Sequence, residues 1–415
     1  MRFLISPYFL ILYQFILMLI PIFFINNKTY SFYINEPDLM YLNLKVYLFI
    51  FINILSFSIA YLSINIKPKI TFFNFRLKRI YLSPNLYFLP LLIFFEVAVG
   101  LFIVIFLKQN SDILPLLFID MTLYKESFKG NFFYFSNYLL MGVLLYTIYQ
   151  KYYFKIKGKL INLFILLGIL EILIATTLLA ARYLLIPFTI SLFVIMIFFK
   201  KVDFKKFILL IIIFISLLIL ITWLRTGAGV TAHSDKSIDL IVKQIMGYTI
   251  ASYNRLAAIL GSKLHFTYEN TGFYLFPALS HIPIFHKILP NFFGVDGTVD
   301  VTKQEFVDVA VASLNENYIW ATLYGYIAST LGWASVVYFY LLGLLYGILW
   351  KQFKNQKIFG IIIYPWAYAC LILVFSSNLL FMPTFISFIY SAIVIMFWNS
   401  LFTFNIVSNE KVRIR

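Results

Sequence analysis

The sequence predicts an all-α polytopic membrane protein with about ten transmembrane helices (roughly 9–12), cytoplasmic N- and C-termini, and one large helical periplasmic loop. Three observations lead to this fold class. Of the 415 residues, 62% are hydrophobic and only 12% are charged, and the mean hydropathy is +0.91, whereas about half of a soluble domain is apolar. Ten apolar stretches are long enough to cross a bilayer. Lys and Arg are concentrated in segments between them.

The apolar stretches follow one another along the chain with short polar connections. A spanning helix needs roughly 20 mainly apolar residues. Such stretches occur at 3–25, 44–66, 86–107, 132–150, 160–181, 183–199, 207–224, 332–350, 358–375 and 380–402. The first follows Met1 and Arg2, exceeds the apolar part of a signal peptide and precedes no small-residue cleavage site, so we expect it to be kept as an anchor.

The basic residues predict the orientation, because Lys and Arg collect in short cytoplasmic loops. With the N-terminus inside, acidic residues are scarce on that side, where only Asp203 and Glu410 occur. The net charge of +16 is then an orientation signal that also attracts anionic lipids, and no nucleic acid partner is expected. Most of the 33 basic residues fall inside: Arg2; Lys67, Lys69, Arg76, Lys78 and Arg79; Lys151, Lys155, Lys157 and Lys159; Lys200, Lys201, Lys205 and Lys206; Lys351, Lys354 and Lys357; Lys411, Arg413 and Arg415.

The first part of the chain, 1–224, is expected to hold helices one to seven. Its outer segments, 26–43 with Tyr30, Tyr33, Glu36 and Asp38 and 108–131, either line a sugar-binding cleft or are solvated loops that cap helices. Glu96 and Glu171 fall near the middles of two spans, where an ionisable side chain normally faces a partner inside the bundle. We expect protonated or hydrogen-bonded structural glutamates, and the alternative is a proton pathway.

The second part, 225–331, is expected to form the periplasmic loop. Gly227 and Gly229 end the preceding helix, and a helix-like run follows over 237–260. All four histidines lie here, but His233, His265, His281 and His286 lack the spacing of a metal site and no cysteine assists them. We therefore expect no metal and no cofactor. A histidine acting as a general base, or loop histidines without a chemical role, are the two alternatives.

Arginines at the expected membrane border are the strongest chemical signal. Arg182 interrupts the apolar run 176–183 at an outer turn, and Arg225 occupies the equivalent level after the seventh helix. Arg255 lies in the adjoining helix-like run. A guanidinium keeps its charge and binds phosphate oxygens in bidentate fashion, so the three side chains favour a site for a lipid diphosphate. The alternative for each is an arginine that reaches the interface without a ligand.

The third part, 332–415, is expected to hold helices eight to ten and a cytoplasmic tail. The loop ends with Asn315-Glu316-Asn317-Tyr318, followed by Tyr324-Gly325-Tyr326 and Leu331-Gly332-Trp333, and then by Gly343 and Gly347 in the next span. With the layout, Arg182 and the late loop that opens with Arg225, this pattern resembles the Wzy-type O-antigen, or oligosaccharide repeat-unit, polymerases of bacterial surface polysaccharide assembly. The likeness spans most of the chain.

The resemblance implies a glycosyltransferase of the bacterial inner membrane that joins undecaprenyl-diphosphate-linked oligosaccharides on the periplasmic face. It also implies membrane lipids, a chain-length regulator and a flippase as partners. Arg182, Arg225 and Arg255 would stabilise the diphosphate leaving group, and His281 or Glu316 would orient or deprotonate the acceptor hydroxyl. Substrate contacts are expected from Tyr248, Tyr253, Asn317 and Tyr318.

Three other readings stay open. A lipopolysaccharide O-antigen ligase would share the layout and the donor but would transfer to a core sugar. A flippase or other transporter would make Glu96 and Glu171 central, although the two halves of the chain show no convincing repeat of the kind that transporters carry. A purely structural membrane protein is the third.

Overall fold

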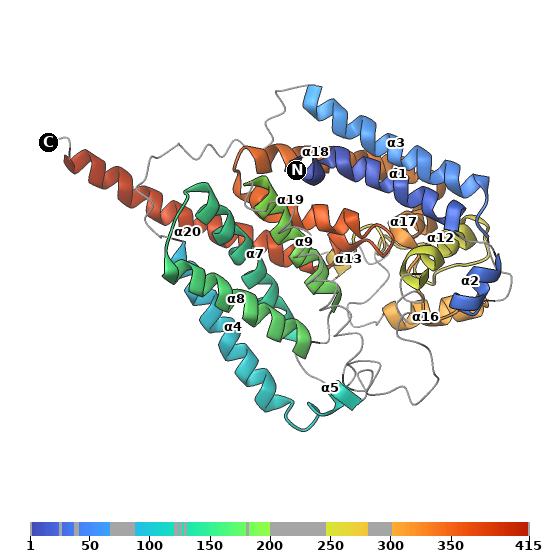
Figure 1. Ribbon diagram of the computed structural model, residues 1–415, viewed down its shortest axis with the longest axis horizontal. Helices are drawn as coiled ribbons and strands as arrows, with labels where there is room; N and C mark the ends of the chain where they lie inside the picture. The colour runs from blue at the N-terminus through green and yellow to red at the C-terminus, as the bar shows by residue number, and fades with distance from the viewer. Residues whose placement is uncertain are drawn as a thin grey trace.

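The computed structural model describes residues 2–24, 27–36, 41–66, 88–119, 124, 127, 131–179, 182–199, 246–280 and 301–413. Every regular element in these ranges is a helix (Figure 1). The expected seventh span, 207–224, and the candidate residues Arg225 and His281 lie outside the described residues.

Two helix groups flank a central helix, α19 (Ile358–Ile372), which packs against members of both. Figure 1 shows α3 along one edge of the molecule and α4 along the other. In the first group, α18 packs along α3, and α1 packs beside them. In the second group, α7 contacts α4, α8, α9 and α20. The bounds of these helices are α1 Pro7–Phe24, α3 Leu44–Ile66, α4 Leu89–Gln109, α7 Asn131–Tyr153, α8 Lys159–Leu178, α9 Arg182–Phe198, α18 Ser335–Lys354 and α20 Pro383–Arg413.

Shorter helices complete the described chain. Figure 1 shows α2, α12 and α16 together at one end of α1 and α3, and the lysine-bearing turn between α7 and α8 lies far from them. The bounds of the shorter helices are η1 Arg2–Ile5, α2 Asn27–Ile34, α5 Leu116–Ile119, η2 Gly247–Ala251, α12 Ser252–Leu260, α13 Pro277–Ser280, α16 Val301–Val311, α17 Thr322–Leu331, η3 Gly332–Ala334 and η4 Leu379–Phe381.

Four helical stretches of the described chain are long and apolar enough to cross a membrane: Leu44–Ile64, Leu89–Gln109, Lys159–Leu178 and Thr322–Lys354. Shorter apolar helices occupy Pro7–Pro21, Leu185–Phe198, Ile358–Ile372 and Thr384–Ser400. The expectation of an all-α membrane protein is therefore confirmed for the described residues. The number of ten spans and the orientation of the termini stay predictions.

Local sequence explains where several of these helices start, stop and approach each other. Pro90 occupies the first turn of α4, where its missing N–H leaves no hydrogen bond unmade. Gly332, with φ of +53°, separates α17 from α18, so the apolar run that was expected to begin at 332 starts ten residues earlier as two consecutive helices. At Gly343 the missing side chain lets α18 approach the carbonyl oxygen of Phe57 in α3, which places the two backbones in contact.

Candidate functional site

Arg255 is the centre of the candidate site. It lies in α12, where every residue from Ser252 to Ile259 is buried, and its own side chain is 0% exposed. The helix packs against α17 and approaches α3, and it follows directly on the π-helical turn η2. The expected helix-like run over 237–260 is thus confirmed from Met246 onward, the residue at which the described part of the run begins.

A buried polar network holds the guanidinium in place. Arg255 Nη1 donates to the hydroxyl of Tyr30 at 3.1 Å, to Glu36 Oε2 at 3.3 Å and to the carbonyl of Ala251 at 3.3 Å. Its Nη2 forms an ion pair with Glu36 Oε1 and donates to the carbonyl of Asn315 at 3.0 Å. A guanidinium fork therefore meets both oxygens of one carboxylate, which is the strong bidentate form of this interaction.

Glu36 and Asn254 make further hydrogen bonds in this network. Glu36 also accepts from the backbone N–H of Asn315 at 2.7 Å and from the hydroxyl of Tyr30. The Asn254 amide donates to Tyr30 at 3.1 Å, and its oxygen accepts from the N–H of Tyr41 at 2.7 Å. We call these five residues, Tyr30, Glu36, Asn254, Arg255 and Asn315, the Arg255 cluster. Burial raises the pKa of Tyr30 above its usual range, so its hydroxyl keeps the proton that it donates.

The Arg255 cluster joins three segments that are far apart in the sequence: α2 with its C-terminal extension, α12 and the turn after α16. Asn315 completes the link by donating from its side chain to the carbonyl of Ile34 at 2.6 Å. Burying an ion pair costs desolvation energy that good geometry and further hydrogen bonds must offset. That geometry is present here, although Nε of Arg255 has no hydrogen-bond partner among the described residues.

The structure brings part of the predicted site to this cluster. Glu316 and Asn317 are exposed and follow directly on Asn315, and the backbone N–H and side-chain amide of Asn317 both donate to Asn315 Oδ1, at 3.0 and 2.9 Å. The ring of Tyr318 packs against Gly247 of η2, where a side chain at residue 247 would collide with it. The segment 315–318 is therefore seated on η2 and α12.

The other predicted site residues are either buried, described only by their backbone, or outside the described residues. Tyr253 is only 2% exposed, so contact with a sugar would require the helices around it to separate, and the same holds for Arg255. Arg182 is the first residue of α9, and Tyr248 lies within η2. For both residues the structure describes the backbone but not the side chain. Arg225 and His281 lie outside the described residues.

Glu305 and Asp308 form a second polar group in the segment expected outside the membrane. Tyr326 donates to Glu305 Oε2 at 3.2 Å, and its ring stacks on Phe266 with centroids 5.3 Å apart. Burial first, and then the charges of Glu305 and Asp308, raise the pKa of Tyr274 above its usual range. We call Phe266, Tyr274, Glu305, Asp308 and Tyr326 the acid–aromatic cluster.

The acid–aromatic cluster has no predicted role, although Glu305 and Asp308 stand out in the sequence as part of an acidic stretch. Their spacing of three residues within Val301–Val311 places them on one face of a helix, which is the signal that would have found them. Asp308 accepts from the backbone N–H and the hydroxyl of Thr267 at 2.8 and 2.7 Å. Within the described ranges, no three His, Cys, Asp or Glu side chains converge in a way that would hold a metal ion.

Asn378 connects this region to the helical bundle. Its side-chain amide donates to the carbonyls of Tyr274 and Leu275, at 3.1 and 3.0 Å, and to the hydroxyl of Tyr338 in α18 at 2.9 Å. Tyr338 in turn donates to the carbonyl of Leu275 at 3.2 Å. The chain at Tyr274 and Leu275 is therefore fixed to α18 and to the turn before η4.

Glu96 and Glu171 face each other across α4 and α8. A side chain at Gly168 of α8 would lie 2.9 Å from Glu96 Oε1, and one at Gly100 of α4 would lie 3.4 Å from Glu171 Oε1. Each carboxyl group is thus seated over a glycine of the opposite helix, and Glu96 is only 4% exposed. This placement agrees with the expectation that both side chains face the bundle.

Comparison with protein-family models, with curated proteins and with solved structures gives no match for this chain. The fold and the Arg255 cluster therefore have to be interpreted from their own chemistry.

Proposed function

We propose that this protein is a membrane glycosyltransferase that joins polyprenyl-diphosphate-linked oligosaccharide repeat units, the activity implied by the resemblance of its sequence. In the reaction, a hydroxyl oxygen of the acceptor attacks the anomeric carbon of the donor sugar. The bond from that carbon to the diphosphate breaks, the electron pair stays on the diphosphate, and the hydroxyl proton passes to a base. Cationic groups at the diphosphate stabilise the charge that develops there.

The Arg255 cluster carries this proposal. It anchors the segment 315–318, which belongs to the motif on which the resemblance rests, and it leaves Glu316 and Asn317 exposed beside a rigid support. In this arrangement Arg255 acts as a positioning residue for the acceptor side. Arg182 and Arg225 are then the groups proposed to meet the diphosphate, and His281 or Glu316 is proposed to take the hydroxyl proton.

The arginines provide the direct test. We expect Arg182→Ala and Arg225→Ala each to lower chain extension by at least about a hundredfold, because each removes a charge that is proposed to stabilise the leaving group, while expression stays normal. The measurement is the lengthening of the saccharide ladder when the purified protein in vesicles receives two lipid-linked repeat units. Lys263→Ala is the matched control, since it removes one exposed positive charge from the expected periplasmic segment that also contains Arg225. Full activity in both arginine variants would contradict the proposal.

The same assay separates the alternatives. A ligase would leave the ladder unchanged and would transfer sugar only when a lipid-anchored core saccharide is supplied. The placement of Glu96 and Glu171 favours a transporter as the second candidate. In that case Glu96→Gln combined with Glu171→Gln would abolish movement of the lipid-linked saccharide across the membrane, and no extension would be seen in any variant.

A further inference from the structure

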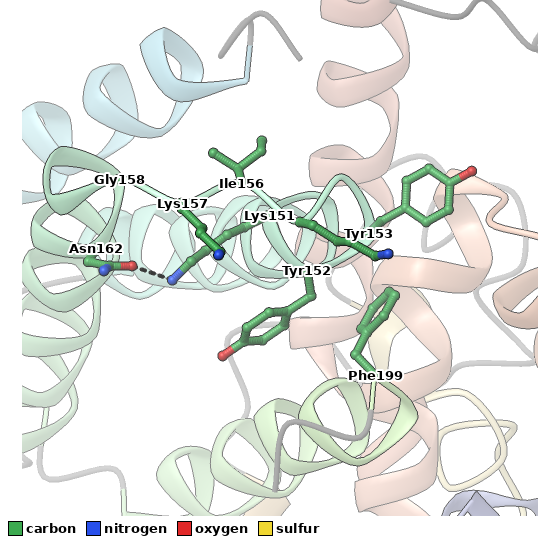
Figure 2. Close-up of a pocket in the computed structure, with 9 residues that line it drawn as sticks. Lys151, Tyr152, Tyr153, Ile156, Lys157, Gly158, Asn162 and Phe199 are labelled. Atoms are coloured by element: carbon green, nitrogen blue, oxygen red, sulfur yellow. Dashed lines mark hydrogen bonds between the residues drawn. The ribbon is translucent and has the colours of Figure 1, made fainter. Parts of the chain in front are cut away.

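A pocket of about 600 Å³ opens where α7 and α9 end and α8 begins (Figure 2). Its lining includes three lysines, Lys151, Lys155 and Lys157, together with Tyr152, Asn162 and Phe199. Among the described residues that line it there is no carboxylate. The pocket is thus a positively charged cavity with aromatic walls, and the turn between α7 and α8 that contributes Lys155 and Lys157 lies far from α12 in Figure 1.

The local chain geometry brings the lysines to one opening. α7 ends at Tyr153, and the N–H of Ile156 then donates to the carbonyl of Lys151 at 3.0 Å, which turns the chain back toward α8. Lys155 occupies the turn with φ of +55°, a left-handed conformation typical of helix ends. Lys155 and Lys157 are both exposed at the opening, so their ammonium groups are available to a ligand.

Lys151 is positioned by groups from two helices. Its ammonium group donates to Asn162 Oδ1 of α8, as Figure 2 shows, and lies 5.5 Å from the centre of the Tyr152 ring. The Tyr152 ring in turn packs against Phe199, with centroids 6.0 Å apart. Lysines at the C-terminal end of a helix are also favoured by the helix dipole, but that effect accounts for neither the cavity nor the extension to Lys157.

An exposed apolar stripe starts at the rim of the pocket and follows α8. Its members share one face of the helix because they are spaced alternately by three and four residues, and each is at least 40% exposed: Leu160, Leu163, Leu167, Leu170 and Ile174. In a helix of this length and hydropathy, such a face is suited to lipid chains. The stripe begins at Leu160, between Gly158 and Asn162, two residues that line the cationic pocket.

We propose that this pocket binds the headgroup of an anionic phospholipid, whose acyl chains lie along the Leu160–Ile174 stripe of α8. Lysine ammonium groups bind phosphate as point charges, and pockets of this charge between membrane helices select anionic headgroups. The aromatic walls exclude water from the glycerol region, and Asn162 holds Lys151 toward the phosphate. The site is independent of the proposed glycosyl transfer.

Lipid retention by the full-length purified protein tests the proposal. In native mass spectrometry with phosphatidylglycerol and phosphatidylcholine of identical chains, we expect preferential retention of phosphatidylglycerol. Lys155→Gln combined with Lys157→Gln should weaken that retention by about thirtyfold, the loss expected for two lysines near an anionic headgroup. The corresponding double arginine variant, which keeps both charges, should restore it.

The matched control is Lys354→Gln with Lys357→Gln, an equal loss of charge in the neighbouring turn between α18 and α19. It should leave retention unchanged. An equal loss in both glutamine variants would mean that only general surface charge attracts the lipid, and equal retention of the two lipids would also overturn the site. Deacylated glycerophosphoglycerol distinguishes a lipid site from a free-phosphate site. We expect it to bind far more weakly than the intact lipid, because it lacks the acyl chains. Equal binding of the two would contradict the role of the α8 stripe.

Discussion

Glu36 and Arg255 are almost completely removed from solvent, with exposed fractions of 1% and 0%. An ion pair in such surroundings fixes the geometry of its neighbours more than it stabilises the fold, because the desolvation cost cancels much of the attraction between the charges. Its effect is to fix Asn315, and with it the exposed Glu316 and Asn317, at a defined distance from α12. The pair thus links a buried charge to the surface that the proposed reaction uses.

Removing one partner of this pair should be far more damaging than replacing both. We expect Glu36→Ala to lower the free energy of unfolding by about 3–5 kcal/mol, because it leaves the Arg255 guanidinium buried without a counter-charge. The double variant Glu36→Leu with Arg255→Met should recover much of that loss. Thermal unfolding of the purified protein measures both effects. A double variant no more stable than Glu36→Ala would show that the pair has no energetic coupling, and the positioning role would then fail.

Among the helices, the contact between α3 and α18 depends on small residues. Gly343 lets α18 approach the backbone of α3 at Phe57. Gly347 lies one turn further along, where an added Cβ would meet side-chain atoms alone, the nearest in Ile64 at 3.1 Å and the next residue being Tyr61 at 3.4 Å. In a membrane, helices associate through such close backbone packing, since surrounding lipid is as apolar as the side chains. The glycines in this span therefore have a structural explanation independent of any family resemblance.

Alanine substitutions at the two glycines should destabilise the protein to different degrees. Gly343→Ala should force α18 away from α3, because the new methyl group meets a rigid carbonyl, and we expect a loss of roughly 1–3 kcal/mol in stability as in other overpacked cores. Gly347→Ala should cost clearly less, since the Ile64 side chain can move. Melting temperature in detergent, with retention of a monodisperse elution peak, is the measurement. Equal melting temperatures for the two variants would show that the close approach at Phe57 is unimportant.

At the scale of the whole molecule, the Arg255 cluster and the lysine-bearing turn between α7 and α8 lie at opposite ends (Figure 1), and this separation predicts how the protein is oriented in the membrane. The segment containing α2, α12 and α16 lies at one end of α1 and α3, while the turn between α7 and α8 lies far from it (Figure 1). Because basic loops stay in the cytoplasm, the lysine-bearing turn should face inward and the Arg255 cluster outward.

Accessibility to a membrane-impermeant thiol reagent tests this orientation. The single native cysteine, Cys370, is buried, so the background reaction should be low. We expect Lys303→Cys in α16 to react in intact cells, whereas Lys157→Cys should react only after the membrane is permeabilised. Both positions are exposed, which makes them comparable. The reverse pattern would place the Arg255 cluster in the cytoplasm, and the proposed glycosyl transfer on the periplasmic face would then be wrong.

Hydropathy along the chain was enough to predict helices over 44–66, 160–181 and 358–375, because the apolar length of a helix is a local property of the sequence. The same local reasoning pointed to Arg255 as a special residue. It did not pair Arg255 with Glu36, which lies 219 positions away, and it left Glu305 and Asp308 without a role. Pairings of this kind depend on which helices pack together, and that packing arises from the shapes of many side chains at once rather than from any single segment.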